Sequence, residues 1–349
     1  MKKKIIISSA ALIIIAIIVG IVVIIHNRTL NHIPKVNKTE LSTIKKNIHI
    51  EIKRYEIDLF SLDVNNLAPG LEKLSKKYPS VFIPEGVWKN PQMIKQLQSF
   101  LQDPIIQDIY KNVMDVYPNL DDITSEIEEA LSYYKYYFPN ATIPTFYSLV
   151  PGIDFMSPSV YAIEDSLFIN LDMYLGQKNK YYNNSGMPLF ISERCDKKFI
   201  AIDCFKKALV YKHLPKQNPV SLLDNIIYEG KKLYFTELLF PDKPAEDIVG
   251  YNKEKFTWAE NNQADVWNYI IQKNILFSTE EKNITNYVGE MPFTKPFSNK
   301  SPGRMGAYIG WQIIRSYVKS HPEVSLESLM LNTDSQDILN KSGFKPTKR

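Results

Sequence analysis

The pattern of apolar and polar residues begins with a long uncharged run at residues 5–25, rich in isoleucine and valine. A helix needs roughly 20 apolar residues to cross the hydrocarbon core of a bilayer. Lys2, Lys3 and Lys4 precede the run, and such a basic cluster favours the cytoplasmic side. The pattern predicts a membrane anchor over residues 1–28, with one transmembrane helix at 5–25. The N-terminus would be cytoplasmic and the rest of the chain would lie beyond the cell membrane.

Two other interpretations of this run are disfavoured. A cleaved signal peptide has an apolar region of about 7–15 residues, followed by small residues at the cleavage site. Here the run is longer, and its small residues at 8–11 lie at the wrong end. A lipoprotein signal needs a cysteine directly after the run, but the only cysteines are Cys195 and Cys204. We therefore expect an uncleaved signal anchor.

After the predicted anchor, the pattern of apolar and polar residues changes twice. Residues 29–47 are polar and show no apolar period, which predicts a juxtamembrane linker. Ile48, Ile50 and Ile52 then alternate with polar residues, which is the period of a β-strand. Apolar residues at 55, 57 and 59 continue in the opposite phase, which predicts a bulge near residues 53–54. Residues 48–349 are expected to form one extracytoplasmic domain.

Helical and extended periods divide the rest of this domain. Apolar spacings of three and four predict helices over most of 67–138 and at 199–213, 222–239, 253–273 and 303–320. Extended segments are predicted at 143–150, 160–163 and 167–171, and the last two would form a hairpin. The expected fold is α+β and mostly helical, with a small, mostly antiparallel sheet against which helices pack.

Composition narrows the classes of function. A hydrophobic fraction of 44% and an aromatic fraction of 12% are sufficient for a substantial core. The formal charge is +4, and the three N-terminal lysines carry most of it, so the predicted domain is almost neutral. Nucleic-acid-binding proteins show a strong basic excess on one face, so this class is disfavoured. Cys195 and Cys204 could form a disulfide in an oxidising compartment or remain two buried thiols, and their spacing leaves both open.

The predicted helix at 222–239 carries two unusual carboxylates. Glu229 falls at the edge of its apolar stripe and Glu237 falls inside it. A buried carboxylate forms an ion pair, binds a cation or takes up a proton. One interpretation is a metal ligand or catalytic acid; the favoured one is an ion pair with Arg194, Arg304 or Arg315. The five histidines are scattered and form no H-E-x-x-H motif, so we predict no catalytic residue, metal site or cofactor.

The predicted helix at 303–320 contains two glycines four residues apart. Gly306 and Gly310 would let another backbone approach closely. Free N–H groups at the start of this helix could instead hold an anion with the help of Arg304. We favour a tight helix crossing near Trp311.

Several short motifs occur in order along the domain. They are YFP at 137–139, LFINLDMYLG at 167–176, LLD at 222–224, IYEGKKLYF at 227–235, Trp267, NILFST at 274–279, PFT at 292–294, SPGR at 301–304, GWQIIRSY at 310–317 and FKP at 344–346. On these motifs the chain resembles the gliding motility-associated lipoprotein GldB family of Bacteroidota. The resemblance implies an envelope protein associated with gliding motility and type IX secretion. Family members typically carry a lipid-modified cysteine, which this chain lacks.

A more distant likeness is to predicted zinc peptidases, in which a Glu-Gly helix supplies a metal ligand and an upstream helix supplies two histidines. Glu229-Gly230 matches the first element. The predicted helix at 199–213 is the counterpart of the second, and it has Asp203, Lys206 and Lys207 where histidines are expected. The likeness implies a degenerate zincin-like fold that has lost its metal site.

The resulting hypothesis is a non-catalytic protein with a periplasmic domain that contacts other gliding motility or envelope proteins and the membrane, but no nucleic acid. The structural or interaction candidates are Asp172, Arg194, Glu229, Arg304, Trp311 and Arg315. One alternative is a membrane-anchored zincin-like hydrolase that uses Glu229. The other is a periplasmic ligand-binding protein, with a pocket lined by residues such as Tyr174, Trp267 and Trp311.

Overall fold

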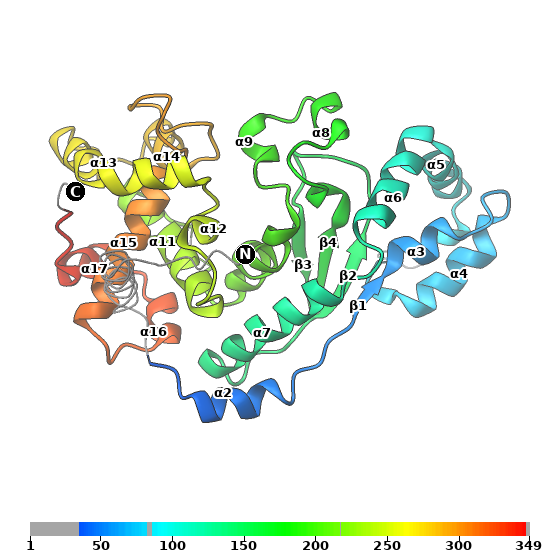
Figure 1. Cartoon of the computed structure of the whole chain (residues 1–349), viewed down its shortest axis with the longest axis horizontal. Coiled ribbons are helices and arrows are strands. Elements are labelled where there is room, and N and C mark those ends of the chain that lie inside the picture. Colours follow the sequence, from blue (N-terminus) through cyan, green and yellow to red (C-terminus); the bar gives the residue numbers. More distant parts are fainter. Residues whose placement is uncertain (1–34, 82–85, 217, 347–349) are drawn as a thin grey trace, which may run out of the picture.

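A computed structural model describes residues 35–81, 86–216 and 218–346 of the chain. The predicted anchor at residues 5–25 lies outside the described residues. Within the described ranges, no helix is both long enough and apolar enough to cross a membrane. Figure 1 shows a sheet with helices α3 to α6 on one side and a body made of helices α11 to α17 on the other.

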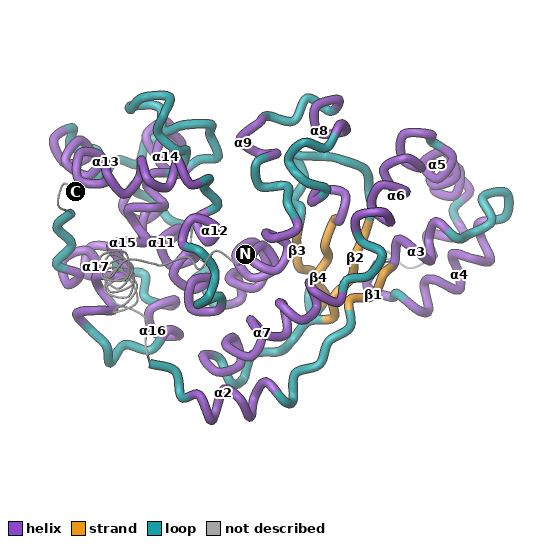
Figure 2. The backbone as a smooth tube through the Cα atoms, viewed as in Figure 1, coloured by secondary structure: helices purple, strands orange, loops and turns teal. Residues whose placement is uncertain are grey.

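The sheet has four strands in the order β1-β2-β4-β3 (Figure 2). Their bounds are Ile52–Arg54 for β1, Thr145–Leu149 for β2, Val160–Ile163 for β3 and Ser166–Asn170 for β4. Strands β3 and β4 form the predicted antiparallel hairpin, but β1 pairs with β2, and β2 with β4, in parallel. The expectation of a mostly antiparallel sheet is therefore wrong. Helices carry the chain from β1 to β2 as a crossover, and β3 takes the outer edge beside β4, which leaves β4 parallel to β2.

The predicted strand over residues 48–59 is also shorter than expected. Only Ile52–Arg54 is extended, and helix α3 (Tyr55–Phe60) follows at once. Tyr55 and Leu59 lie one helical turn apart and are both buried, so a helical start explains the change of apolar phase better than a bulge. The buried Glu56 accepts hydrogen bonds from Arg54 Nε at 2.7 Å and from Ser148 Oγ at 2.8 Å, which joins α3 to the sheet.

The predicted linker is structured in its second half. Residues Lys38–Lys45 form helix α2, whose N-cap Asn37 accepts hydrogen bonds from the Thr39 and Glu40 amides. The Asn37 amide donates to the hydroxyl of Tyr136 at 3.2 Å, so α2 is held against α7. The predicted linker thus contains a helix at residues 38–45, which local capping and contact with α7 stabilise.

Four longer helices cover the predicted region 67–138. They are α4 (Leu67–Lys77), α5 (Pro91–Gln102), α6 (Pro104–Val116) and α7 (Asp121–Tyr137), with short 3-10 turns at Pro79–Val81 and Val87–Lys89. Alternation along the strands separates two cores. Tyr147 and Phe168 pack on residues of α3, α4 and α5, whereas Phe146 and Leu167 face the larger core that continues into the C-terminal helices.

The chain after β4 is helical in short and long pieces. The 3-10 turn η3 (Leu171–Tyr174), α8 (Lys180–Asn184) and α9 (Leu189–Ser192) come first. The predicted helix at 199–213 is broken into η4 (Lys197–Phe199), α10 (Ile200–Asp203), a π-helical turn η5 (Cys204–Ala208) and η6 (Leu209–Lys212). The remaining helices are α11 (Leu222–Leu239), α12 (Ala245–Val249), α13 (Lys253–Gln272), α14 (Glu281–Val288), α15 (Met305–Ser320), α16 (Leu326–Leu331) and α17 (Ser335–Ser342).

Helices α11 and α15 cross with their backbones in contact. A Cβ atom added to Gly310 would lie 2.7 Å from the carbonyl carbon of Ile226, and one added to Gly230 would lie 2.8 Å from the Cα atom of Gly310. Neither position has room for a side chain, so the predicted tight crossing near Trp311 is confirmed. The crossing places successive turns of the two helices against each other.

The two cysteines are free and buried. The Sγ atom of Cys195 lies 3.7 Å from Met187 Sδ. Cys204 begins the π-helical turn, and η4 and α10 separate it from Cys195 along the chain. In this structure the two residues are separate buried thiols and form no disulfide with each other.

Candidate functional site

The candidate site is a charge network at the crossing of α11 and α15, centred on Arg304. This residue is the N-cap of α15 and has a left-handed backbone with φ of 60°. Its Nη2 atom donates to Glu229 Oε2 at 2.9 Å, and its Nη1 atom lies 3.5 Å from Glu290 Oε1. One guanidinium thus connects a carboxylate on α11 with a carboxylate on the loop after α14.

Glu229 has a second cationic partner on its own helix. Its Oε1 atom accepts a hydrogen bond from Lys232 Nζ at 2.8 Å. Desolvation acts to raise the pKa of Glu229, but the ammonium of Lys232 and the guanidinium of Arg304 outweigh it and hold this pKa below its ordinary value. Both carboxylate oxygens are therefore engaged, and the side chain is ionised at neutral pH.

Arg194 completes the network from the other side of Glu290. Its Nη1 and Nη2 atoms donate to the two oxygens of Glu290 at 3.2 and 2.7 Å, which is a bidentate pair. The cavity beside Arg194, Arg304 and Glu290 has a volume of about 30 Å³. This is far below the roughly 300–1,000 Å³ of a typical ligand pocket. The network therefore borders only a small cavity.

The broken helix before α11 supplies three further charged groups. Asp203 Oδ2 accepts from Tyr174 Oη at 2.8 Å and lies 2.7 Å from Lys207 Nζ. Lys206 donates to the carbonyl of Ile248 at 3.0 Å, and burial lowers its pKa to about 7. These residues stand where the distant likeness to zinc peptidases expects histidines. Here their side chains are engaged with one another and with the backbone.

A second charged pair lies further along the same helix crossing. The buried carboxylate of Glu237 accepts hydrogen bonds from Trp311 Nε1 at 2.8 Å and from Arg315 Nε at 3.0 Å, and Arg315 Nη2 forms a further short contact with it. The Arg315 guanidinium lies over the Trp311 ring, 3.7 Å from its centroid. Glu237, the acidic residue inside the apolar stripe of α11, thus pairs with a cationic residue of α15, Arg315.

Asp172 lies apart from both pairs, in η3 directly after β4. It is fully buried, and its Oδ2 atom accepts a hydrogen bond from the Gly152 amide at 2.8 Å. Burial raises its pKa to about 7, against backbone hydrogen bonds that lower it. The carboxylate of Asp172 therefore links the loop after β2 to the end of β4.

The structure brings some of the predicted residues together and separates others. Arg194, Glu229 and Arg304 share the network, whereas Trp311 and Arg315 belong to the second pair. Tyr174 and Trp311 are core residues, and Trp267 packs edge-on against Phe344, so these three do not form a common pocket wall.

Two partners in the network were absent from the predicted set. Lys232 carries a signal in the sequence, because it lies one helical turn after Glu229. Glu290 carries none, because it lies on an irregular loop whose position depends on the whole fold. Among the residues described, no three histidine, cysteine, aspartate or glutamate side chains are grouped as metal ligands.

A family model described as "Gliding motility protein GldB" matches residues 35–346. Neither the curated proteins nor the solved structures contain a significant match to the chain.

Proposed function

The chain belongs to the GldB family of gliding motility proteins, and from this membership and the charge network we propose a non-catalytic role in the cell envelope. The protein would act in the gliding motility apparatus, associated with type IX secretion, through contacts with other motility or envelope proteins.

The observation that carries the proposal is the state of Glu229. In the distant likeness to zinc peptidases this carboxylate would be a metal ligand, yet here Arg304 and Lys232 hold both of its oxygens. A divalent cation would have to displace two buried positive charges and would then face them at close range. The small cavity beside the network supports the same conclusion, because a hydrolase needs space for its substrate.

We also propose that the apolar run at residues 5–25 anchors the protein in the membrane. The described domain would then lie in the periplasm, with the N-terminal lysines in the cytoplasm. Lipoproteins are attached through a cysteine, and this chain has none directly after the apolar run. A membrane-spanning run would attach it to the envelope instead.

Site-specific photo-crosslinking in the native host tests the proposed role. A photoreactive residue would replace Met156 or Leu189, two strongly exposed apolar residues on separate loops and short helices. The exposed Lys319 on α15 is the control position. The proposal predicts crosslinks from at least one test position to motility or envelope proteins. Crosslinks from all positions to cytosolic proteins alone would contradict it.

A further inference from the structure

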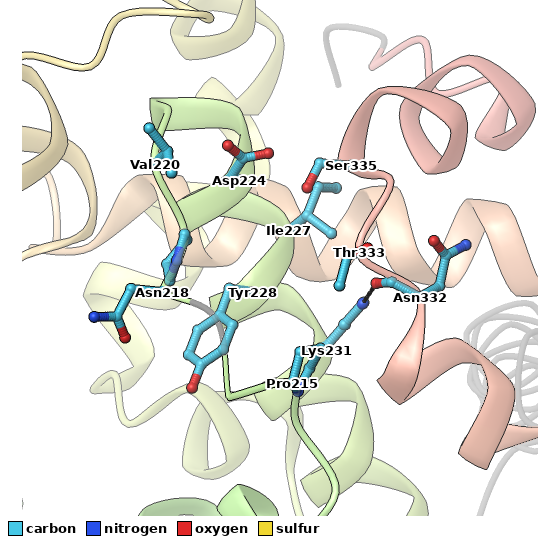
Figure 3. Close-up of a pocket in the computed structure, with 11 residues that line it drawn as sticks. Pro215, Asn218, Val220, Asp224, Ile227, Tyr228, Lys231, Asn332, Thr333 and Ser335 are labelled. Atoms are coloured by element: carbon cyan, nitrogen blue, oxygen red, sulfur yellow. Dashed lines mark hydrogen bonds between the residues drawn. The ribbon is translucent and has the colours of Figure 1, made fainter.

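A pocket of about 160 Å³ lies between α11 and the C-terminal helices, and its lining residues are separate from the charge network (Figure 3). Three parts of the chain form its walls: residues 215 and 218–220, one face of α11, and the connection at 332–335 between α16 and α17. Its apolar lining consists of Pro215, Pro219, Val220, Ile227 and Tyr228. A cavity of about 150 Å³ in another protein holds benzene, so this pocket has room for a ring-sized group.

The polar end of the pocket contains a buried ammonium group. Lys231 is only 3% exposed. Its Nζ atom donates to the backbone carbonyl of Met330 at 3.4 Å and to that of Asn332 (Figure 3). These acceptors are neutral, and no ion pair joins Lys231 to a carboxylate within the described part of the chain. The other strongly buried lysine described, Lys206, has Asp203 Oδ1 at 4.0 Å.

The acidic residue that lines the pocket does not serve as the counter-ion. Asp224 lies two helical turns before Lys231, at the opposite end of the pocket in Figure 3. Its Oδ2 atom accepts hydrogen bonds from the Ser221 amide at 2.9 Å and from Ser221 Oγ at 2.8 Å, as part of the capping box of α11. A buried cation without an opposite charge is unfavourable, and an anion in the pocket would relieve this.

We propose that this pocket binds a carboxylate ligand with a ring-sized apolar group. The carboxylate would pair with Lys231, and the apolar group would pack against Val220, Ile227 and Tyr228. Such a ligand could be a free carboxylic acid or the carboxyl-terminal residue of a peptide. Because Val220 lines the pocket and is 64% exposed, an extended chain leaving it would also find an apolar contact.

Calorimetric titration of the full-length chain tests this proposal. Sodium benzoate is the probe for a free acid, and benzamide is the neutral control of the same size. An N-acetylated tripeptide ending in phenylalanine tests the peptide source, with its C-terminal amide as the control. We expect saturable binding of benzoate or of the acidic peptide, at least tenfold tighter than binding of the matching amide. Whichever acid binds more tightly identifies the source of the carboxylate.

Two variants assign the binding to this pocket. Lys231→Met removes the charge at similar length, and Val220→Trp fills the pocket from an exposed position while it leaves the lysine in place. Each should weaken binding at least tenfold, whereas Lys319→Met, at an exposed site on α15, should not change it. The proposal is overturned if neither acid binds saturably to the wild-type chain, or if binding survives Val220→Trp unchanged. It does not depend on the envelope role, which rests on other residues.

Discussion

The contact between α11 and α15 predicts a large response to one added methyl group. In a Gly310→Ala variant the new Cβ atom would lie 2.7 Å from the Ile226 carbonyl carbon and closer still to its oxygen. Ordinary Cβ contacts begin near 3.4 Å. The obstructing atoms belong to the backbone of α11 and cannot rotate away. The helices must therefore separate by on the order of 1 Å, which loosens dispersion contacts along the whole crossing.

The magnitude follows from two opposing effects. Forcing extra volume into a packed core costs about 1–3 kcal/mol, and backbone contacts place this site at the upper end. Alanine gains at most about 1 kcal/mol over glycine in helix propensity. We expect a net loss of about 2 kcal/mol in the free energy of unfolding. At about 2–4 °C per kcal/mol, this lowers Tm by roughly 4–8 °C.

Urea denaturation and thermal unfolding, followed by tryptophan fluorescence, measure this loss. Gly70→Ala in α4 is the matched control, because the nearest atoms that its added Cβ would meet are side-chain carbons of Leu62, which can move. The control should be neutral or slightly stabilised. The reasoning fails if Gly310→Ala is as stable as the wild type, or if both variants lose equal stability.

Three further predictions concern buried carboxylates. Glu229→Ala should destabilise the protein by about 2–3 kcal/mol in urea, since it leaves Arg304 short of one partner; an unchanged midpoint would contradict the pairing. Glu237→Gln should cost about 1–3 kcal/mol by weakening the pair with Arg315, and a neutral effect would count against a buried ion pair there. Burial raises the pKa of Asp172 from 3.8 to about 7, so its contribution to stability falls as the pH rises from about 4 to 7. Asp172→Asn should therefore gain stability relative to wild type between pH 5 and pH 8, and a pH-independent difference would refute the raised pKa.

Much of the helical architecture could be predicted from the sequence, because long helices carry strong local signals. The limits of α11 follow from its capping box and its apolar stripe. Asp103 and Pro104 likewise mark the start of α6. Strand direction could not be predicted in this way, since β1 and β2 are separated by about 90 residues and their pairing depends on the path of the helices between them.

The candidate site was predictable only in part for a similar reason. The position of Glu229 on an apolar helix face indicates that it needs a partner, and Arg304 is one of the three arginines predicted as partners. The choice between them depends on the crossing of α11 with α15, which brings residues 75 positions apart into contact. Glu290 could not be predicted, because its loop shows no apolar period and it pairs with Arg194 only after the fold has formed.

The metal content of the purified chain tests the central claim most directly. The full-length protein and its Glu229→Gln variant would be purified without chelators, supplied with zinc, desalted and analysed by elemental mass spectrometry. If Arg304 and Lys232 satisfy Glu229 as the geometry indicates, both proteins will retain far less than one zinc per chain. Their zinc contents will also be equal. One tightly held zinc per wild-type chain that is absent from the variant would contradict the non-catalytic account and identify Glu229 as a metal ligand.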